Sequence, residues 1–593
     1  MKKLFFLWII TISLPFLTGC EDFLSLQSYT TKDSESFPRT EEDATQMLTG
    51  VYSSLVRTHN GGYFWYAMLA ADERFGGGGI NDRGPQAISH LLCTGNTQTN
   101  SIWTSHYTAI ANANATLAAL ENMETSEAII QKIGEAKILR AHFYFSLVQL
   151  LGDVPIMKSA PEDLAAAQAA PPQATQEEIY AFIVKDLWDA YNSMPTCKWN
   201  TYPSGTLTKW AAAGMLGRVY LFYTGFYQKS VLPMEGGGQV TGDQVAAALK
   251  DCIDNSGHVL VDDFRSLWSY TNSQSKPDYP YAKDAPTWVM DGENPEHIFV
   301  VKLIVHNSYP SSTYTNNIAM SCGPAMGPNS NYKTMFPLGQ GWGMGPVNTR
   351  FYDDWVKDEP DDLRRKASIW HYKEETYFEG IGEARVELPC EDVYFKNQAG
   401  ADRRLEQTGL WNKKIISIRS YKTPGGDLWG SFLSSPAYFD QPNDVFMHNN
   451  GQDLIWLRYA DVLLMHSEIT KTADGLNSVR ARVNLPAVAY SLDAIQKERR
   501  HELAFEAIRW GDIRRWHIAE DVLDRKYGVE IENDTKFTHM QPQNAQTCAE
   551  RYRRTKGFWP ISQTQIDLDP TLKQNAGWEN YTEVLYSAWT DKE

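Results

Sequence analysis

The fold is decided most clearly by the stretch Gly134-Glu-Ala-Lys-Ile-Leu-Arg-Ala-His-Phe-Tyr-Phe-Ser-Leu-Val-Gln-Leu-Leu151. Its apolar residues recur three and four positions apart, which places them on one side of a helix. They form two adjacent stripes, one of Leu139, Phe143, Leu147 and Leu150 and one of Ile138, Ala141, Phe145 and Val148. The pattern predicts a helix that packs against neighbours on two sides and ends at Gly152-Asp-Val-Pro155.

Helical spacing continues on both sides of this stretch. Thr40 precedes three acidic residues, an arrangement that favours a helix start. Further helices are predicted at about 101–123, 127–151, 175–194, 207–226, 243–255, 454–483 and 492–516. Within 209–225, small residues come first and large ones later, so another element can approach the small side closely. Helical hairpins of this kind predict a tetratricopeptide-like scaffold, although no strict period of about 34 residues is present.

The middle of the chain has a different texture. Between about 256 and 450, Gly, Pro, Asn, Ser and aromatic residues crowd together and helical spacing thins out. Long loops in compact proteins usually carry function. Short strands are predicted at Ile298–Val305 and Lys414–Ile418. We therefore expect a mainly α fold: an N-terminal helical region at 40–255, a loop-rich, partly β ligand-binding lobe at 256–450, and a C-terminal helical region at 451–593 that packs on the same body.

The N-terminus has the pattern of a bacterial lipoprotein signal. Lys2 and Lys3 precede an apolar run that is too short to span a bilayer comfortably, and Leu17-Thr-Gly-Cys20 follows it. This order predicts that residues 1–19 are removed, that Cys20 is acylated, and that residues 20–39 form a tether. Several acyl chains hold a protein on a membrane because each buried methylene contributes about 0.8 kcal/mol. The alternative is an ordinary secretory signal. After the N-terminal signal, no stretch of the sequence approaches the roughly 18 apolar residues of a membrane span.

Charge and composition narrow the partners. The chain has 55 basic and 72 acidic residues, a formal charge of −17. Nucleic acid is excluded as a partner because phosphate binding needs a basic face. The chain is rich in aromatic residues, with 19 Trp and 30 Tyr, and sugars bind by stacking their C–H faces on such rings, so the composition favours a carbohydrate ligand. The cysteines beyond Cys20 lack metal-ligand spacing, and we expect mostly buried free thiols.

No catalytic constellation stands out. His501-Glu502 begins like a zinc-protease signature, but the position of the second histidine is Phe505, so no zinc site is expected. The glycine-rich stretch Gly339–Gly345 lacks the helix and acid of a phosphate-binding site, and we interpret it as a mobile loop that carries an aromatic residue. The acids Asp353, Asp354, Asp358, Glu359, Asp361 and Asp362 could include a hydrolytic pair. A solvated helix end is the simpler interpretation.

The ligand site is expected among aromatic residues on loops. Tyr63-Phe-Trp-Tyr66 follows two glycines, and Asp72-Glu73 precedes a polar, glycine-rich turn. An aromatic platform beside such turns suits a ligand with several hydroxyls. The candidate ligand-binding residues are Trp65, Tyr66, Asp72, Asn81, Arg83, Trp288, Tyr309, Tyr314, Trp342 and Trp429.

Several motifs occur in a fixed order in the C-terminal half. They are Trp456-Leu-Arg-Tyr-Ala-Asp-Val-Leu-Leu-Met-His-Ser-Glu468, Asn477-Ser-Val-Arg-Ala-Arg482, Lys497–Trp516, Gly557-Phe-Trp-Pro-Ile561 and Gln574-Asn-Ala-Gly-Trp578. The N-terminal half adds the Cys20 motif, Glu21-Asp-Phe-Leu24, Gly50-Val-Tyr52, Ala71-Asp-Glu73, Glu135–Tyr144 and Gly152-Asp-Val-Pro155, and mid-chain there is Asp362-Leu-Arg364. Together these motifs resemble the SusD/RagB family of outer-membrane nutrient-binding lipoproteins. Ala507 departs from the family pattern, which often has Gly at this position.

The resemblance implies a non-enzymatic protein on the outer face of the outer membrane, to which Glu21 and Asp22 would direct it. It would capture an oligosaccharide with a SusD-like helical superhelix and pass it to a TonB-dependent, SusC-like transporter. Two alternatives stay open: capture of peptides by a RagB-type protein, and a lipid-anchored glycoside hydrolase. No cofactor is expected, and the sequence leaves open whether calcium steadies a loop. The charges at Glu498, Arg499, Glu502, Glu506 and Arg509 are interpreted as scaffold ion pairs, with Leu503, Ala504, Ala507 and Ile508 facing inward.

Overall fold

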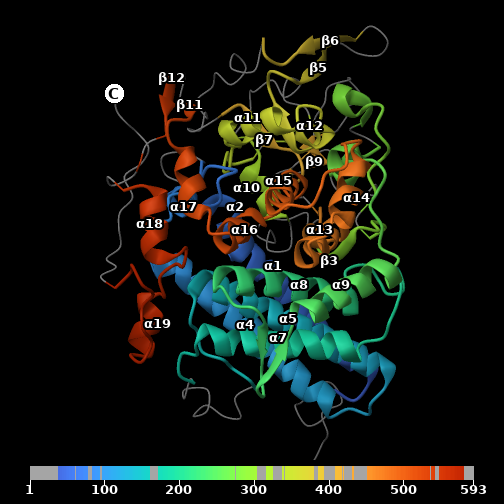
Figure 1. Ribbon diagram of the computed structural model, residues 1–593, viewed down its shortest axis with the longest axis vertical. Helices are drawn as coiled ribbons and strands as arrows, with labels where there is room; N and C mark the ends of the chain where they lie inside the picture. The colour runs from blue at the N-terminus through green and yellow to red at the C-terminus, as the bar shows by residue number, and fades with distance from the viewer. Residues whose placement is uncertain are drawn as a thin grey trace, which may run out of the picture.

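The fold is mainly α-helical, with short strands that pair two by two (Figure 1). The computed structural model describes residues 38–60, 62–77, 83–93, 96–159, 171–273, 276–290, 292–303, 316–324, 337–339, 341–379, 385–392, 408–416, 418–419, 431–432, 451–533, 536–540, 542 and 546–579. The predicted signal, Cys20 and nearly all of the predicted tether lie outside these residues.

The first half forms a series of long helices packed side by side, seen in the lower part of Figure 1. In order of contact they are α1 (Glu41–Asn60), α4 (Asn96–Glu121), α5 (Glu127–Leu151), α7 (Gln176–Ser193), α8 (Lys209–Phe226) and α9 (Gly242–Asn255). These bounds confirm the predicted helices. Each helix in the series packs against the next, which is the arrangement expected of tetratricopeptide-like hairpins.

Helix α5 lies at the centre of this series. Ser126 caps its start by accepting a hydrogen bond from the Ile129 amide, and Gly152, with a φ of 69°, ends it. Both predicted apolar stripes are buried, because α4 covers one side and α7 the other. The prediction of two-sided contact is confirmed.

The small residues of α8 let other elements approach its backbone. A Cβ atom added at Gly214 would lie 2.3 Å from a methyl carbon of Leu457, and one added at Gly217 would lie 3.1 Å from Leu249. Leu457 belongs to strand β10 (Leu454–Arg458), and Leu249 belongs to α9. The close approach predicted for this helix is therefore real, and one of the two neighbours is a strand.

Strand β10 joins the two halves of the chain. It pairs in antiparallel fashion with β3 (His297–Val301), so the predicted strand at Ile298–Val305 is confirmed in its first part. The helix predicted from residue 454 is wrong in its first turn, because every residue of β10 is buried and a short apolar run suits a central strand as well as a helix. Helices α13 (Tyr459–Thr470) and α14 (Asp474–Arg482) follow.

The helix predicted at 492–516 is broken. Helix α15 (Leu492–Glu502) is followed by a turn in which Phe505 and Ala507 have φ values of 66° and 60°, and α16 (Arg509–Arg515) begins after this turn. Residues with positive φ cannot continue a right-handed helix. The conformation of Ala507 also explains why glycine suits this position.

The remaining α-helices and strands of the described residues are short. They are α2 (Tyr63–Ala70), α3 (Arg83–Ser89), β1 (Leu232–Met234), β2 (Gly238–Val240), α10 (Asn317–Cys322), α11 (Thr349–Asp358), α12 (Leu363–Ser368), β4 (Ile369–His371), β5 (Thr376–Glu379), β6 (Val386–Pro389), β7 (Leu410–Asn412), β8 (Ile418–Arg419), β9 (Ser431–Phe432), α17 (Ala519–Val522), β11 (Glu530–Asn533), β12 (Lys536–His539), α18 (Cys548–Thr555) and α19 (Gln563–Leu568). The predicted strand at Lys414–Ile418 is wrong over 414–416, which connect β7 to β8.

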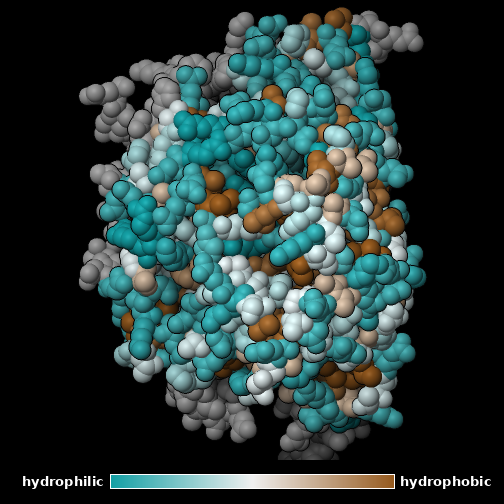
Figure 2. All heavy atoms as spheres, in the orientation of Figure 1, coloured by the Kyte–Doolittle hydropathy of each residue, from teal (hydrophilic) through white to brown (hydrophobic). Residues whose placement is uncertain are grey.

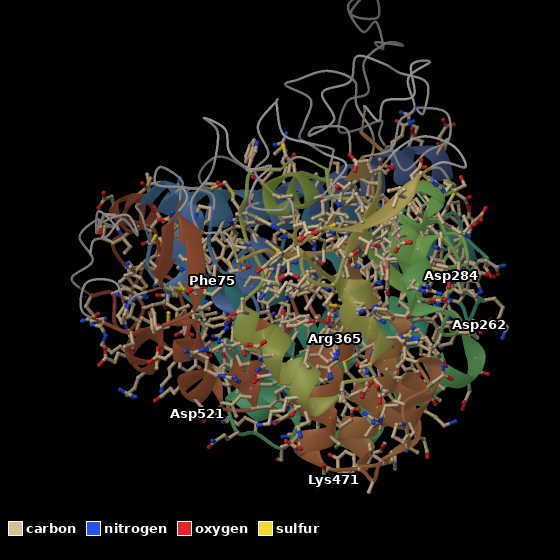
Figure 3. All side chains as sticks on the ribbon, turned by 90° about the horizontal axis from the view of Figure 1, so that it is seen from above. Phe75, Asp262, Asp284, Arg365, Lys471 and Asp521 are labelled. Atoms are coloured by element: carbon tan, nitrogen blue, oxygen red, sulfur yellow. The ribbon has the colours of Figure 1, made fainter. Side chains whose placement is uncertain are left out.

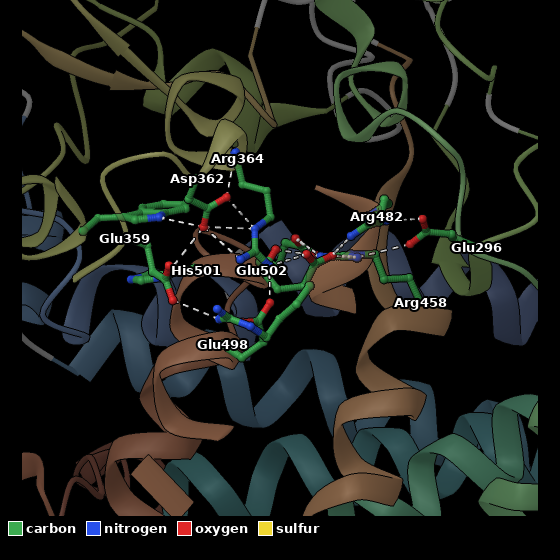
Figure 4. A network of polar contacts seen from close by, with 12 residues as sticks. Glu296, Glu359, Asp362, Arg364, Arg458, Arg482, Glu498, His501 and Glu502 are labelled. Atoms are coloured by element: carbon green, nitrogen blue, oxygen red, sulfur yellow. Dashed lines mark hydrogen bonds and ion pairs between the residues drawn. The ribbon is translucent and has the colours of Figure 1, made fainter. Parts of the chain in front are cut away.

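A cluster of buried charges ties the second half together (Figure 4). This buried ion cluster consists of Glu296, Asp362, Arg364, Lys414, Arg458, Arg480, Arg482, Glu498, Glu502 and Glu506. Glu502 accepts from Arg458 at 2.6 Å and from Arg364 at 2.9 Å, and it also pairs with Arg482. The scaffold role predicted for these charges agrees with this, but the charges lie in the interior and not on an outer helix face.

One face of the molecule can be followed in Figure 2. On the face shown in Figure 2, hydrophilic residues predominate and hydrophobic ones lie in scattered groups. No helix within the described ranges is long and apolar enough to cross a membrane.

Candidate functional site

Helix α2 carries the first candidate aromatics. All of its residues are buried except Trp65, which is half-buried. Tyr66 is one of the buried residues, and its ring packs edge-on against Trp559 with centroids 4.7 Å apart. Tyr66 is therefore part of the core, and Trp65 is the aromatic residue of α2 with surface left for a ligand.

The residues directly after α2 are bonded to the C-terminal part of the protein. Asp72 accepts from Arg509 Nε at 2.7 Å and from Arg500 Nη2 at 3.0 Å. Burial alone would raise the pKa of Asp72, but the two guanidiniums lower it well below its ordinary value. The predicted ligand role of Asp72 is replaced by a structural one, because its side chain is 1% exposed and both oxygens are bound by arginine.

Glu73 and Lys526 strengthen this attachment. Glu73 Oε2 accepts from the Phe505 amide at 3.2 Å, and burial, with the neighbouring Asp72, raises the pKa of Glu73 to about 7. Lys526 donates to the carbonyls of Leu69 and Ala70 at the end of α2, at 3.2 and 3.1 Å. A cation at the C-terminus of a helix is favourable. Helix α2 is therefore held at its end by side chains from the far end of the sequence.

The glycine-rich stretch that carries Trp342 is fixed by backbone hydrogen bonds. The amides of Trp342, Gly343 and Met344 donate to the carbonyls of Met320, Gly323 and Ser321 at 3.0, 2.8 and 2.9 Å. A Cβ atom at Gly341 would lie 2.5 Å from Gly323 Cα, so only glycine fits where the two backbones meet. Our expectation of a mobile loop at Gly339–Gly345 is wrong for residues 341–345, which run along the end of α10. Trp342 itself is half-buried.

The segment after α2 meets this loop directly. Arg74 and Val347 form a β-bridge, and the Phe75 amide donates to the Pro346 carbonyl at 3.0 Å. Phe75, labelled in Figure 3, is fully buried and shares an apolar cluster with Ile531 of β11. The fold therefore connects the element that carries Trp65 to the loop that carries Trp342, through residues 74–77. Trp65 and Trp342 are the candidate aromatic residues that the described part of the chain leaves half-buried.

The other candidates fall into two groups. Trp288 is buried in the second apolar cluster, so it fills the core and does not face a ligand. Arg83 begins helix α3, and its side chain lies outside the described part. Asn81, Tyr309, Tyr314 and Trp429 also lie outside the described residues.

Sequence reasoning missed Arg74. Its guanidinium stacks on the Phe505 ring at 4.6 Å, and its Nη1 lies 3.0 Å from Met68 Sδ, all in the interior. Arg74 thus contacts both α2 and the loop of Trp342 from the interior of the protein. No signal in the sequence separates such an arginine from a surface one, because its partners come from distant segments.

Three of the six mid-chain acids form ion pairs. Asp354 pairs with Arg500 and Arg525, Glu359 pairs with Arg480, and Asp362 is buried against Arg364. Burial alone would raise the pKa of Asp362, but Arg364 lowers it, which is the opposite of what a catalytic acid needs. Asp353, Asp358 and Asp361 are exposed.

The last candidates for chemistry are the metal-ligating and thiol side chains in the described part of the chain. His501 stacks on Trp355, with ring centroids 4.5 Å apart, and no group of three or more metal-ligating side chains is found within the described ranges. Cys252, Cys322, Cys390 and Cys548 are buried free thiols and Cys197 is a half-buried one, which confirms the expectation for these positions.

Family comparisons agree with this architecture. Residues 295–578 match the model of the SusD family, and residues 22–221 match a SusD-like model described as starch-binding associating with outer membrane. Together the two models cover most of the chain. This chain belongs to the SusD/RagB family.

Individual SusD-like relatives have low sequence identity to this chain but align over most of its length. A SusD-like protein of Bacteroides ovatus is 24% identical over 453 residues, which is 73% of this chain and 68% of the relative. A laminarin-binding SusD-like protein of known structure has a TM-score of 0.65 at 23% identity, covering 91% of this chain and 100% of that one. Surface glycan-binding protein A from Bacteroides thetaiotaomicron, in complex with laminarihexaose, gives a TM-score of 0.65 at 17% identity, with 91% and 100% covered. These likenesses establish the SusD fold for the chain.

Proposed function

We propose that this SusD/RagB family member captures a neutral glycan on the surface that carries Trp65 and Trp342, and that it does so without catalysis. The observation that carries the proposal is the fixed backbone under Trp342, since an aromatic ring held in place loses little conformational entropy when a sugar stacks on it. Support comes from the solved SusD-like structures described as laminarin-binding or bound to laminarihexaose.

The proposal extends to location and transfer. Acylation at Cys20 would anchor the protein to the outer membrane on its extracellular face, and a SusC-like TonB-dependent transporter would receive the glycan. A tether raises the effective concentration of captured ligand near the transporter without a need for tight binding. Replacing Cys20 with Ala should move the protein from the detergent phase to the aqueous phase and abolish labelling on intact cells. Retention of the variant in the membrane would contradict the anchor.

Binding is tested with purified mature protein and laminarin as the first probe, followed by a panel of other glucans and peptides. Trp342→Ala and Trp65→Ala should each weaken glycan binding by about tenfold or more, as expected for a buried aromatic anchor. Trp188→Ala is the matched control, because Trp188 is a half-buried tryptophan on α7, away from this surface. Equal losses in all three variants would contradict the assignment.

Two outcomes separate the alternatives. If only peptides raise the melting temperature of the protein, the family scaffold is used for peptide capture and the glycan proposal fails. If new reducing ends appear during incubation with a glycan, the protein is a hydrolase. Asp353→Asn would then be the first variant to examine, because partial desolvation and the neighbouring Asp354 raise the pKa of Asp353.

A further inference from the structure

A cleft lies apart from the surface that carries Trp65 and Trp342. It is formed by residues 199–208 ahead of α8, by His258 after α9, and by residues 292–300 leading into β3. Its volume is about 120 Å³. A single buried water needs roughly 10–15 Å³ on the same measure, so the cleft has room for a ligand much larger than one water.

Three buried polar atoms that belong to residues lining this cleft have no hydrogen-bond partner in the described part of the chain. They are Asn294 Nδ2, His297 Nδ1 and His297 Nε2. The Asn294 side chain is 2% exposed, and its Oδ1 accepts from the Glu296 amide at 3.0 Å, which fixes the orientation of the amide group. Buried polar groups in native proteins are nearly always satisfied. The oriented amide of Asn294 and the imidazole of His297 can therefore form hydrogen bonds with a ligand that both donates and accepts.

The cleft carries no charge. Its lining contains no Asp, Glu, Lys or Arg, and consists of Trp199, Asn200, Tyr202, Pro203, Ser204, Gly205, Thr206, Thr208, His258, Gly292, Asn294, His297, Ile298 and Val300. Burial lowers the pKa of His258 to about 4 and that of His297 to about 3, so both rings are neutral at pH 7. Lys302 Nζ lies 3.4 Å from Ser204 Oγ, but it is already paired with Asp453. A charged ligand would therefore lose its hydration here without gaining an unpaired counter-charge. The lining favours a neutral, polar ligand.

Aromatic rings and hydroxyls complete the lining. Trp199 and Tyr202 are half-buried, and the Trp199 amide donates to the Ser256 carbonyl at 2.9 Å, which anchors its backbone. The indole of Trp199 lies against His258, with ring centroids 6.4 Å apart. A flat apolar ring beside convergent neutral hydrogen-bonding groups suits a molecule with an apolar face and a rim of hydroxyls.

We propose that this cleft is a second ligand site that binds one neutral sugar ring. It shares no lining residue with the surface of Trp65 and Trp342, and it does not require that surface to bind glycan. Trp199 or Tyr202 would stack on the sugar, while Asn294 donates to one hydroxyl and His297 exchanges hydrogen bonds with others. Such a site would hold a single residue of a longer chain or a free monosaccharide.

The experiment uses mature protein and a panel of neutral monosaccharides, namely glucose, galactose, mannose and xylose, with glucuronate as the charged counterpart of glucose. Binding is followed by ligand-observed saturation-transfer NMR. The dissociation constant for the best neutral sugar should be about millimolar, as expected for so small a ligand. Asn294→Leu, His297→Phe and Trp199→Ala should each weaken binding by about tenfold. Glucuronate should bind more weakly than glucose.

Controls separate this site from the first one. Trp342→Ala should leave monosaccharide binding intact, and Trp199→Ala should leave laminarin capture at the first surface intact. Thermal melts check the folding of the Asn294 and His297 variants, and Trp199→Ala keeps the test decisive because it removes only a half-exposed ring. The inference is overturned if no sugar in the panel binds, if Trp342→Ala removes binding while Trp199→Ala does not, or if soaked crystals show only water in the cleft.

Discussion

Replacing Glu502 with Gln should destabilise the protein more than any surface charge change. The Glu502 side chain is fully buried and is shared by Arg364, Arg458 and Arg482. Burial alone would raise its pKa, but the three guanidiniums lower it well below its ordinary value. Gln keeps the shape and removes the charge, so three buried cations lose their common counter-ion.

The expected cost is about 3–5 kcal/mol of unfolding free energy, the range found when one partner of a buried ion pair is removed. The assay is urea unfolding at pH 7, followed by tryptophan fluorescence, with the slope of the transition compared between variants. Glu520→Gln is the matched control, because Glu520 pairs with Arg553 at the surface, where the Arg553 side chain is 60% exposed. Its cost should stay below about 1 kcal/mol.

A loss of less than about 1 kcal/mol for Glu502→Gln, equal to that of Glu520→Gln, would refute this reasoning. It would mean that water or the remaining acids of the buried ion cluster compensate for the missing charge. A change in the slope of the transition would instead report a partly folded state.

Three further predictions follow from the fold and the site. Burial lowers the pKa of His59 and His106 to about 4, so the unfolded state takes up protons first and stability should fall as pH drops from about 6.5 to 4, by up to about 3 kcal/mol per histidine. Urea midpoints measured across this range test it, and the His59→Gln, His106→Gln double variant should show a flatter profile. Ala507→Gly should stabilise the protein by about 0.5–1 kcal/mol in the same assay, because Ala507 has a φ of 60°; a loss would contradict strain at this turn. Gly341→Ala should displace the loop of Trp342 and reduce laminarin binding as Trp342→Ala does, and unchanged binding would show that the loop yields without moving the ring.

Much of the helical half could be predicted because its residues repeat with one period. In α5 the apolar stripes identify both the helix and its two buried sides. Strand β10 was missed because Leu454–Arg458 is a short, wholly buried run, and such a run has no period that distinguishes a strand from a helix.

The charged motifs and the site depend on contacts between distant segments. Glu498 and Glu502 have the spacing of surface ion pairs, yet their partners Arg364, Arg458 and Arg482 come from other elements and enclose them. The sequence predicted ligand roles for Trp65, Trp342 and Asp72, and the fold leaves the two tryptophans half-buried. Only the fold reveals that Arg500 and Arg509 occupy the carboxylate of Asp72.

The attachment of α2 also fixes when the binding surface can form. Asp72 is bonded to Arg509, 437 positions later in the chain, so a polypeptide emerging from the ribosome cannot fix α2 in place until nearly all of it has been made. The helices from α4 to α9 contact near neighbours in sequence and can assemble earlier. The proposed ligand-binding face is therefore among the last parts of the molecule to form, and chains truncated before residue 509 would keep a helical body without that face.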